Sequence, residues 1–130
     1  MTIVWKDSYK VGEAVIDEQH ERLFELANKI IATEDMATQA LCALQFAQYT
    51  RDHFAYEEAL MREINFPDYA GHVVWHKQLI TRLKLASEFI EKGTLDKQDL
   101  EGFIADWAMQ HIPVHDAQLA TYITARRAAA

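Results

Sequence analysis

Glycine and proline are so scarce in this chain that the intervals between them constrain its fold more than any other feature. Only 4 of the 130 residues are glycine and 2 are proline. These residue types most often interrupt regular structure, so their absence over long stretches predicts long continuous elements. Within those stretches apolar residues recur at three- and four-residue steps, the period of a helix with one buried face. The sequence therefore predicts an all-α protein.

Four long helices are expected from this periodicity, and Pro113 interrupts the last of them. The expected helices cover residues 17–33, with Asp17 as the N-cap, then 38–65, 69–92 and 96–111. Pro113 lacks a backbone donor and clashes with the carbonyl four residues earlier, so a kink or break is expected near His111. A short helix should follow over residues 115–124, and the residues from Arg126 onward should fray.

Residues 1–15 differ from the rest of the chain, because their apolar side chains follow no regular period. We expect them to lie as an extended arm across the helices. The connections between the helices are short, which favours antiparallel neighbours. The predicted fold is an antiparallel up-down four-helix bundle with an extended N-terminal arm and a short C-terminal helix, forming a single domain over residues 1–130.

The balance of charge disfavours several classes of partner. Lysine and arginine total 13 against 20 for aspartate and glutamate, and the net charge of -7 repels a phosphate backbone, so nucleic acid is not an expected partner. No apolar run reaches the ~18 residues that a membrane span needs, and the first residues lack the features of a signal peptide. A cytoplasmic location is expected. Cys42 is the single cysteine, which excludes an intrachain disulfide, and we assign it no role.

The histidines are the main anomaly, because five of the six lie on the apolar stripes of four different helices. A buried imidazole must satisfy one donor and one acceptor, and leaving either unpaired costs about 1 to 3 kcal/mol. A single buried histidine is more often a hydrogen-bonded core residue than a metal ligand. Five together favour one shared explanation, a metal centre formed by His20, His53, His72, His76 and His111.

The spacing of these residues strengthens the metal interpretation. Residues four apart on a helix have Cβ atoms roughly 5 to 6 Å apart on one face, and two such pairs occur, His53 with Glu57 and His72 with His76. Glu58 is rotated by about 100° from Glu57, so it is expected to be solvated or to support a ligand from behind.

A further carboxylate or imidazole follows His111, and spacing alone leaves two candidates about equal. Asp116 is five residues after His111, a step that shares a face only if the helical turn is widened or broken, which Pro113 favours. His115 is four residues after His111. Its alternative interpretation is a histidine at the surface or behind the ligands.

Taken in order, these residues resemble the full ligand pattern of the hemerythrin family, and the likeness covers essentially the whole chain. The pattern is His20, His53-x-x-x-Glu57, His72-x-x-x-His76 and His111-Ile112-Pro113-Val114-His115-Asp116, and the residues 16–20 look like the family's entry to its first helix. The free-standing bacterial members of the family are the most similar. The family's fold is the four-helix bundle inferred above.

The resemblance implies a non-haem di-iron centre. Its two iron ions would be bridged by an oxo or hydroxo group and by two carboxylates, Glu57 and Asp116, which selects Asp116 over His115. One iron would be completed by His72, His76 and His111, and the other by His20 and His53. Counting about twelve octahedral positions leaves about one open, on the second iron, where the family binds dioxygen. Spacing alone does not exclude zinc or manganese.

The expected function is reversible dioxygen binding, for oxygen storage, transport or delivery to an oxygen-consuming enzyme, by a protein that is not itself an enzyme and is a monomer. Carboxylate-rich bundle sites activate dioxygen, whereas nitrogen dominates this set. The alternatives are a sensor of oxygen or nitric oxide and a di-iron oxidase or peroxidase. Storage of many iron or zinc ions is disfavoured by so closed a site. Four apolar residues could wall the oxygen pocket or simply pack in the core: Trp5, Phe54, Trp107 and Ile112.

Overall fold

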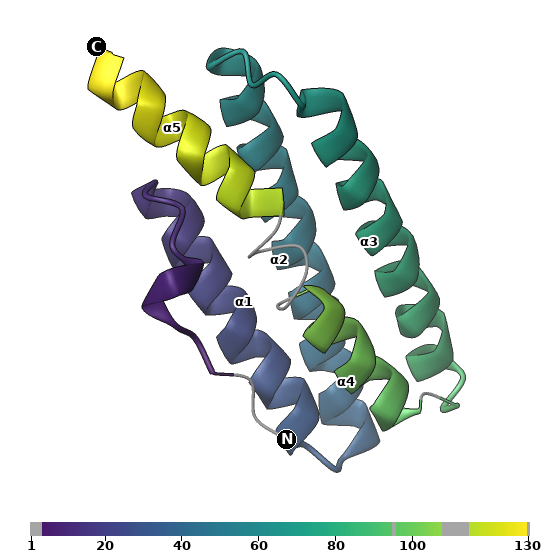
Figure 1. Ribbon diagram of the computed structural model, residues 1–130. Helices are drawn as coiled ribbons and strands as arrows, with labels where there is room; N and C mark the ends of the chain where they lie inside the picture. Colours follow the sequence, from purple (N-terminus) through teal and green to yellow (C-terminus); the bar gives the residue numbers. More distant parts are fainter. Residues whose placement is uncertain (1–3, 95, 108–114, 130) are drawn as a thin grey trace.

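The structure is a computed structural model that describes residues 4–94, 96–107 and 115–129, and helices dominate those residues (Figure 1). Within these residues, a short 3-10 helix is followed by five α-helices. In chain order they are η1 (Asp7–Tyr9), α1 (Ala14–Ala32), α2 (Met36–Glu63), α3 (Tyr69–Glu91), α4 (Lys97–Asp106) and α5 (Ala117–Ala129).

The helices form the predicted antiparallel up-down bundle. Helix α2 packs along both α1 and α3, and α4 lies against α1. Helices α4 and α5 follow one another along the length of the bundle and together fill its fourth position (Figure 1). The predicted break near His111 and Pro113 lies outside the described residues. On either side of it, Trp107 and Asp116 lie in wider, π-helical turns.

The first helix begins earlier than predicted, because its cap is a different acidic residue. The Glu13 side chain accepts a hydrogen bond from the Ile16 backbone N–H at 2.8 Å, so Glu13 is the N-cap and the expectation for Asp17 was wrong. The Asp17 carboxylate instead accepts from the Val11 backbone N–H at 2.7 Å. This bond ties the N-terminal arm to the first turn of α1.

The C-terminal helix is also longer than predicted. It continues through Ala129, whereas the residues from Arg126 onward were expected to fray. Two contacts anchor it to distant parts of the chain: the Tyr122 hydroxyl donates to the carbonyl of Ile64 at 3.1 Å, and Arg127 donates to the carbonyl of Gly12. Helical order therefore persists where tertiary contacts anchor the helix to the rest of the chain.

Two apolar clusters fill the interior, and a layer of polar side chains separates them. The larger cluster includes Leu23, Phe24, Ile30, Phe46, Leu79 and Trp107, and the smaller consists of Val11, Ile16, Met61, Phe66, Leu119 and Ile123. Along α1, for example, His20 falls between Ile16 and Leu23. Each large apolar side chain contributes about 1.5 to 3 kcal/mol on burial. The apolar clusters thus hold the polar layer in place from both sides.

None of the helices that the structure describes is both long enough and apolar enough to cross a membrane.

Candidate metal centre

Six of the seven predicted ligands lie together in the polar layer between the two apolar clusters. Helix α1 supplies His20, α2 supplies His53 and Glu57, α3 supplies His72 and His76, and Asp116 immediately precedes α5. Each of the six is at most 2% exposed. The seventh, His111, lies outside the described residues. The helix faces inferred from residue spacing therefore bring these six side chains together in one buried cluster.

One half of the cluster is formed by the two histidines of α3. The Nε2 atoms of His72 and His76 lie 2.5 and 3.2 Å from Oε1 of Glu57. The His72 Nε2 atom also lies 3.1 Å from Oδ1 of Asp116. The imidazole rings are 4.7 Å apart and perpendicular, so both present their Nε2 atoms to the same carboxylate oxygen.

The other half is formed by the histidines of α1 and α2, and it faces the second oxygen of each carboxylate. The Nε2 atoms of His53 and His20 lie 3.3 and 3.9 Å from Oε2 of Glu57. The His20 Nε2 atom is also 3.1 Å from Oδ2 of Asp116. Glu57 and Asp116 therefore each direct one oxygen toward the α3 histidines and one toward His20 and His53.

Among the described residues, several atoms of this second half have no hydrogen-bond partner, and a bound cation would satisfy them. Among the described residues, His20 Nε2, His53 Nε2 and Glu57 Oε2 have no partner with hydrogen-bond geometry. The His53 Nδ1 atom lies 2.8 Å from the amide oxygen of Gln19, which can only accept, so Nδ1 carries the proton. The lone pair of His53 Nε2 then faces a carboxylate oxygen in a dry interior. A metal ion between these atoms would turn that repulsion into coordination.

The electrostatics of the metal-free cluster differ between its halves. Burial alone would lower the pKa of His72, but hydrogen bonds with Asp116 and Glu57 outweigh it and raise the pKa to about 10. Burial, reinforced by neighbouring His20, lowers the pKa of His53 to about 3. Burial would raise the pKa of Glu57, but the hydrogen bonds from His72 and His76 hold it well below its ordinary value. The surroundings of His72 thus favour positive charge in the first half, where a cation would bind.

Within the described residues, two triads have ligand atoms close enough to share one ion. They are His20 with His53 and Glu57, and Glu57 with His72 and His76. Glu57 belongs to both triads. Buried imidazole nitrogens combined with carboxylate oxygens suit iron, zinc or manganese.

The two candidates that follow His111 in sequence occupy different surroundings. Asp116 is fully buried and contacts histidines of both halves. His115 is half-buried and packs edge-on against Trp75, with ring centroids 4.6 Å apart. The structure therefore brings Asp116 into the cluster and leaves His115 at its edge.

Two further side chains hold ligands from behind. Glu58, expected to be solvated or supporting, lies 2.9 Å from His76 Nδ1 and accepts its proton. Gln19, which holds His53, was not identified from the sequence. The only sign of its role in the sequence was its position next to His20. The contact of Gln19 with His53 joins α1 to α2, so it depends on how the helices pack.

Of the four predicted wall residues, two lie beside His20 and one beside His76. The rings of Trp5 and Trp107 are 6.3 and 6.1 Å from the His20 ring. Phe54 instead stacks on His76 at 3.8 Å. The fourth residue, Ile112, lies outside the described residues. The apolar wall is therefore concentrated around the half that holds His20 and His53.

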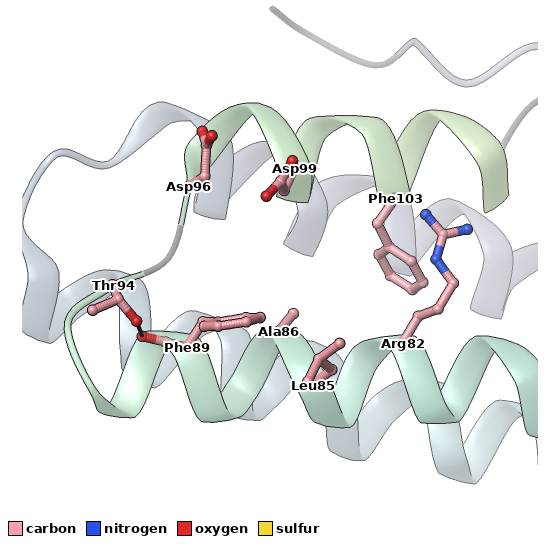
Figure 2. A pocket seen from close by; sticks show the side chains of 8 residues that line it. All are labelled: Arg82, Leu85, Ala86, Phe89, Thr94, Asp96, Asp99 and Phe103. Carbon is pink, nitrogen blue, oxygen red and sulfur yellow. Dashed lines mark hydrogen bonds between the residues drawn. The ribbon is translucent and has the colours of Figure 1, made fainter.

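A surface cleft of about 310 Å³ lies apart from this cluster, between α3 and α4 (Figure 2). Phe89 and Leu85 of α3 face Phe103 of α4 across it, and none of the candidate ligands lines it. The buried cluster, rather than this cleft, carries the chemistry predicted from the sequence.

A four-helix bundle with a buried, nitrogen-rich set of imidazoles and carboxylates defines the class of non-haem metal-binding bundle proteins. The family model of the hemerythrin HHE cation-binding domain matches residues 11–123. The chain belongs to the hemerythrin family.

Individual relatives agree with this assignment. The chain is 31% identical over 126 residues to a bacteriohemerythrin of Stenotrophomonas maltophilia (strain R551-3), covering 95% of this chain and 82% of the relative. It is 30% identical over 109 residues to a myohemerythrin of Riftia pachyptila, covering 84% and 83% of the two chains. The crystal structure of a wild-type hemerythrin superposes with a TM-score of 0.86 at 23% identity, covering 95% and 98%, which confirms the predicted fold.

Proposed function

We propose that this protein binds dioxygen reversibly at a di-iron centre held by the seven predicted ligands, His20, His53, Glu57, His72, His76, His111 and Asp116. One observation carries the proposal: each of two buried carboxylates directs one oxygen toward each of two histidine groups. Two metal positions bridged by Glu57 and Asp116 would satisfy every one of these atoms. We further propose that residues 1–130 form one domain around this centre.

The two halves of the cluster support different tasks. The histidines of α3, with His111, would saturate one iron, whereas His20 and His53 would leave the other with an open position. Iron held at these positions would supply the electrons that dioxygen binding requires. The protein contributes fixed imidazole nitrogens and carboxylates that bridge the halves.

The surroundings of His20 support reversibility rather than turnover. Trp5, Phe24 and Trp107 pack together next to its ring and are at least half-buried. Such a wall excludes the water and protons that would otherwise release reduced oxygen and leave the iron oxidised. We therefore favour a carrier that stores oxygen or delivers it to an oxygen-consuming enzyme over a di-iron oxidase.

The visible spectrum of the iron-loaded, reduced protein tests this proposal. The spectrum is recorded without oxygen, then with oxygen, then after purging with inert gas. Reversible dioxygen binding predicts a nearly colourless form that becomes coloured and reverts on purging. Irreversible conversion to an oxidised form would reject the carrier role and favour a sensor or a redox enzyme. The Glu57→Ala variant, prepared in parallel, should show no reversible colour.

A further inference from the structure

The two halves of the cluster are supported from behind by different side chains, and this difference has a consequence for metal binding. The His76 Nδ1 proton is accepted by the Glu58 carboxylate at 2.9 Å, and the His53 Nδ1 proton by the Gln19 amide at 2.8 Å. Both bonds orient an imidazole ring whose Nε2 atom faces a carboxylate oxygen of Glu57. One supporting group is an anion and the other is neutral.

We propose that Glu58 and Gln19 make the two halves unequal, so that divalent metal ions fill the centre in a fixed order, first beside His72 and His76 and then beside His20 and His53. This inference rests on the proposed two-metal centre. Glu58 and Gln19 act as positioning residues, through the histidines that they hold.

The charges of the described cluster support this order. Glu57 and Asp116 each give one oxygen to each half, so they do not distinguish the halves. Glu58 is the additional anion, and it contacts only the first half. Its side chain is 24% exposed, so solvent screens a charge on it only in part. A carboxylate behind a histidine also makes the ligating nitrogen more basic, which an amide does much less.

The geometry supports the same order. In the first half, Nε2 atoms lie 2.5 and 3.2 Å from Glu57 Oε1. In the second half, the corresponding distances to Glu57 Oε2 are 3.3 and 3.9 Å. The first half is therefore the more compact around its shared oxygen. An ion bound there would also fix both bridging carboxylates before the second ion arrives.

His111, which the proposed centre assigns to the first half, would also favour filling of that half first. The order of filling in the native protein therefore does not isolate Glu58, and substitutions are needed. Glu58→Gln removes the charge but keeps an oxygen that can accept from His76. Gln19→Glu adds a charge behind His53. Glu63→Gln, at the exposed end of α2, removes the same charge without contacting a candidate ligand and is the matched control.

The experiment titrates the metal-free protein with Co²⁺, whose visible absorption reports coordination, in competition with a chelator. We expect two ions to bind in two resolved steps. Glu58→Gln should weaken the first step by about 10- to 100-fold and change the second much less. Gln19→Glu should strengthen the second step and bring the two steps together. Glu63→Gln should match the native protein, and circular dichroism should show all variants equally helical.

Side-chain ¹⁵N NMR of the histidines, with one equivalent of Zn²⁺, identifies the half that fills first. The signals of His72 and His76 should shift before those of His20 and His53. Two equal steps, an unchanged first step in Glu58→Gln, or earlier shifts of His20 and His53 would each overturn the inference while leaving a two-metal centre intact. Failure of the protein to bind two ions would overturn the proposed centre itself, and this inference with it.

Discussion

The two halves of the buried cluster use the same residue type around the same carboxylate, yet the pKa of His72 in one half and that of His53 in the other are shifted in opposite directions. His72 makes hydrogen bonds with Glu57 and Asp116, and its pKa rises to about 10 despite burial. His53 is fully buried beside His20, and its pKa falls to about 3. The comparison shows that burial acts to lower the pKa of both histidines, and that hydrogen bonds with two carboxylates reverse this effect at His72.

The side chains around the two halves of the cluster also differ. The α3 half is backed by a charged side chain, Glu58, whereas the other half is walled by Trp5, Phe24 and Trp107. A polar backing favours tight retention of a cation, and an apolar wall favours a dry open position. Under the proposed function, this difference would separate the residues that hold the metal from those that surround its open position.

Removing Glu57, the residue common to both halves, should have the largest effect on metal affinity and on stability. Glu57→Ala eliminates the oxygen shared by each triad, so affinity for both metal ions should fall by more than about 100-fold. The metal-free protein should lose about 3 to 5 kcal/mol of unfolding free energy, because His72 loses a buried ionic partner. Metal titration and urea unfolding measure the two effects. Glu63→Ala, which removes an exposed carboxylate from α2, should show neither.

The second carboxylate that joins the halves should be next in importance. Asp116→Ala removes an oxygen 3.1 Å from both His20 and His72, and should weaken metal binding by about 10- to 100-fold. His115→Ala, its neighbour at the edge of the cluster, should change the affinity by less than about 3-fold. A more severe effect from His115 than from Asp116, measured by the same titration, would reverse our choice between them.

The opposite pKa shifts predict a stability maximum for the metal-free protein. The pKa of His72 is raised, so its stabilising contribution is fully present below pH 6.5 and is lost as pH rises through about 10. The pKa of His53 is lowered, so its contribution is present above pH 6.5 and is lost as pH falls toward 3. Glu57 adds to the acid loss below its ordinary value of 4.5.

Urea unfolding at a series of pH values measures this profile. The unfolding free energy should decline on both sides of a maximum near pH 6.5. His53→Leu should flatten the acid side between pH 6.5 and 4.5, and His72→Leu the alkaline side. A profile that is unchanged in both variants would contradict the contrast between the halves.

The smallest expected effect concerns the apolar wall. Trp5→Ala removes a half-buried indole next to His20 and leaves the α3 half untouched, so metal affinity should stay within about 3-fold of the native value. Loss of the wall admits water, and the colour of the oxygen-loaded protein should decay several-fold faster. Leu44→Ala, at an exposed position of α2, is the control. An unchanged decay rate would show that Trp5 does not help to exclude water from the site.

Much of the fold and most of the site could be predicted from local pattern. The helical period identified four long helices and placed His53 with Glu57, and His72 with His76, on shared faces, because positions four apart coincide on any α-helix. Boundaries were less predictable. Asp17 has the residue type of an N-cap, but Glu13 caps α1 and Asp17 holds the arm. The extension of α5 depends on contacts of Tyr122 and Arg127 with residues far away in the chain.

The sequence by itself determined the set of candidate ligands, because ligand type and helical spacing are local properties, and the resemblance to the family added the choice of Asp116 over His115. Only the tertiary structure decided how those residues are divided between the two halves of the cluster. It brought Gln19 of one helix against His53 of another, set Glu58 behind His76, and turned the two oxygens of Glu57 toward different histidine pairs. Apart from the contact of His53 with Glu57 inside α2, these contacts join separate helices, and their physical effects depend on distances of a few ångströms that follow from packing the whole bundle.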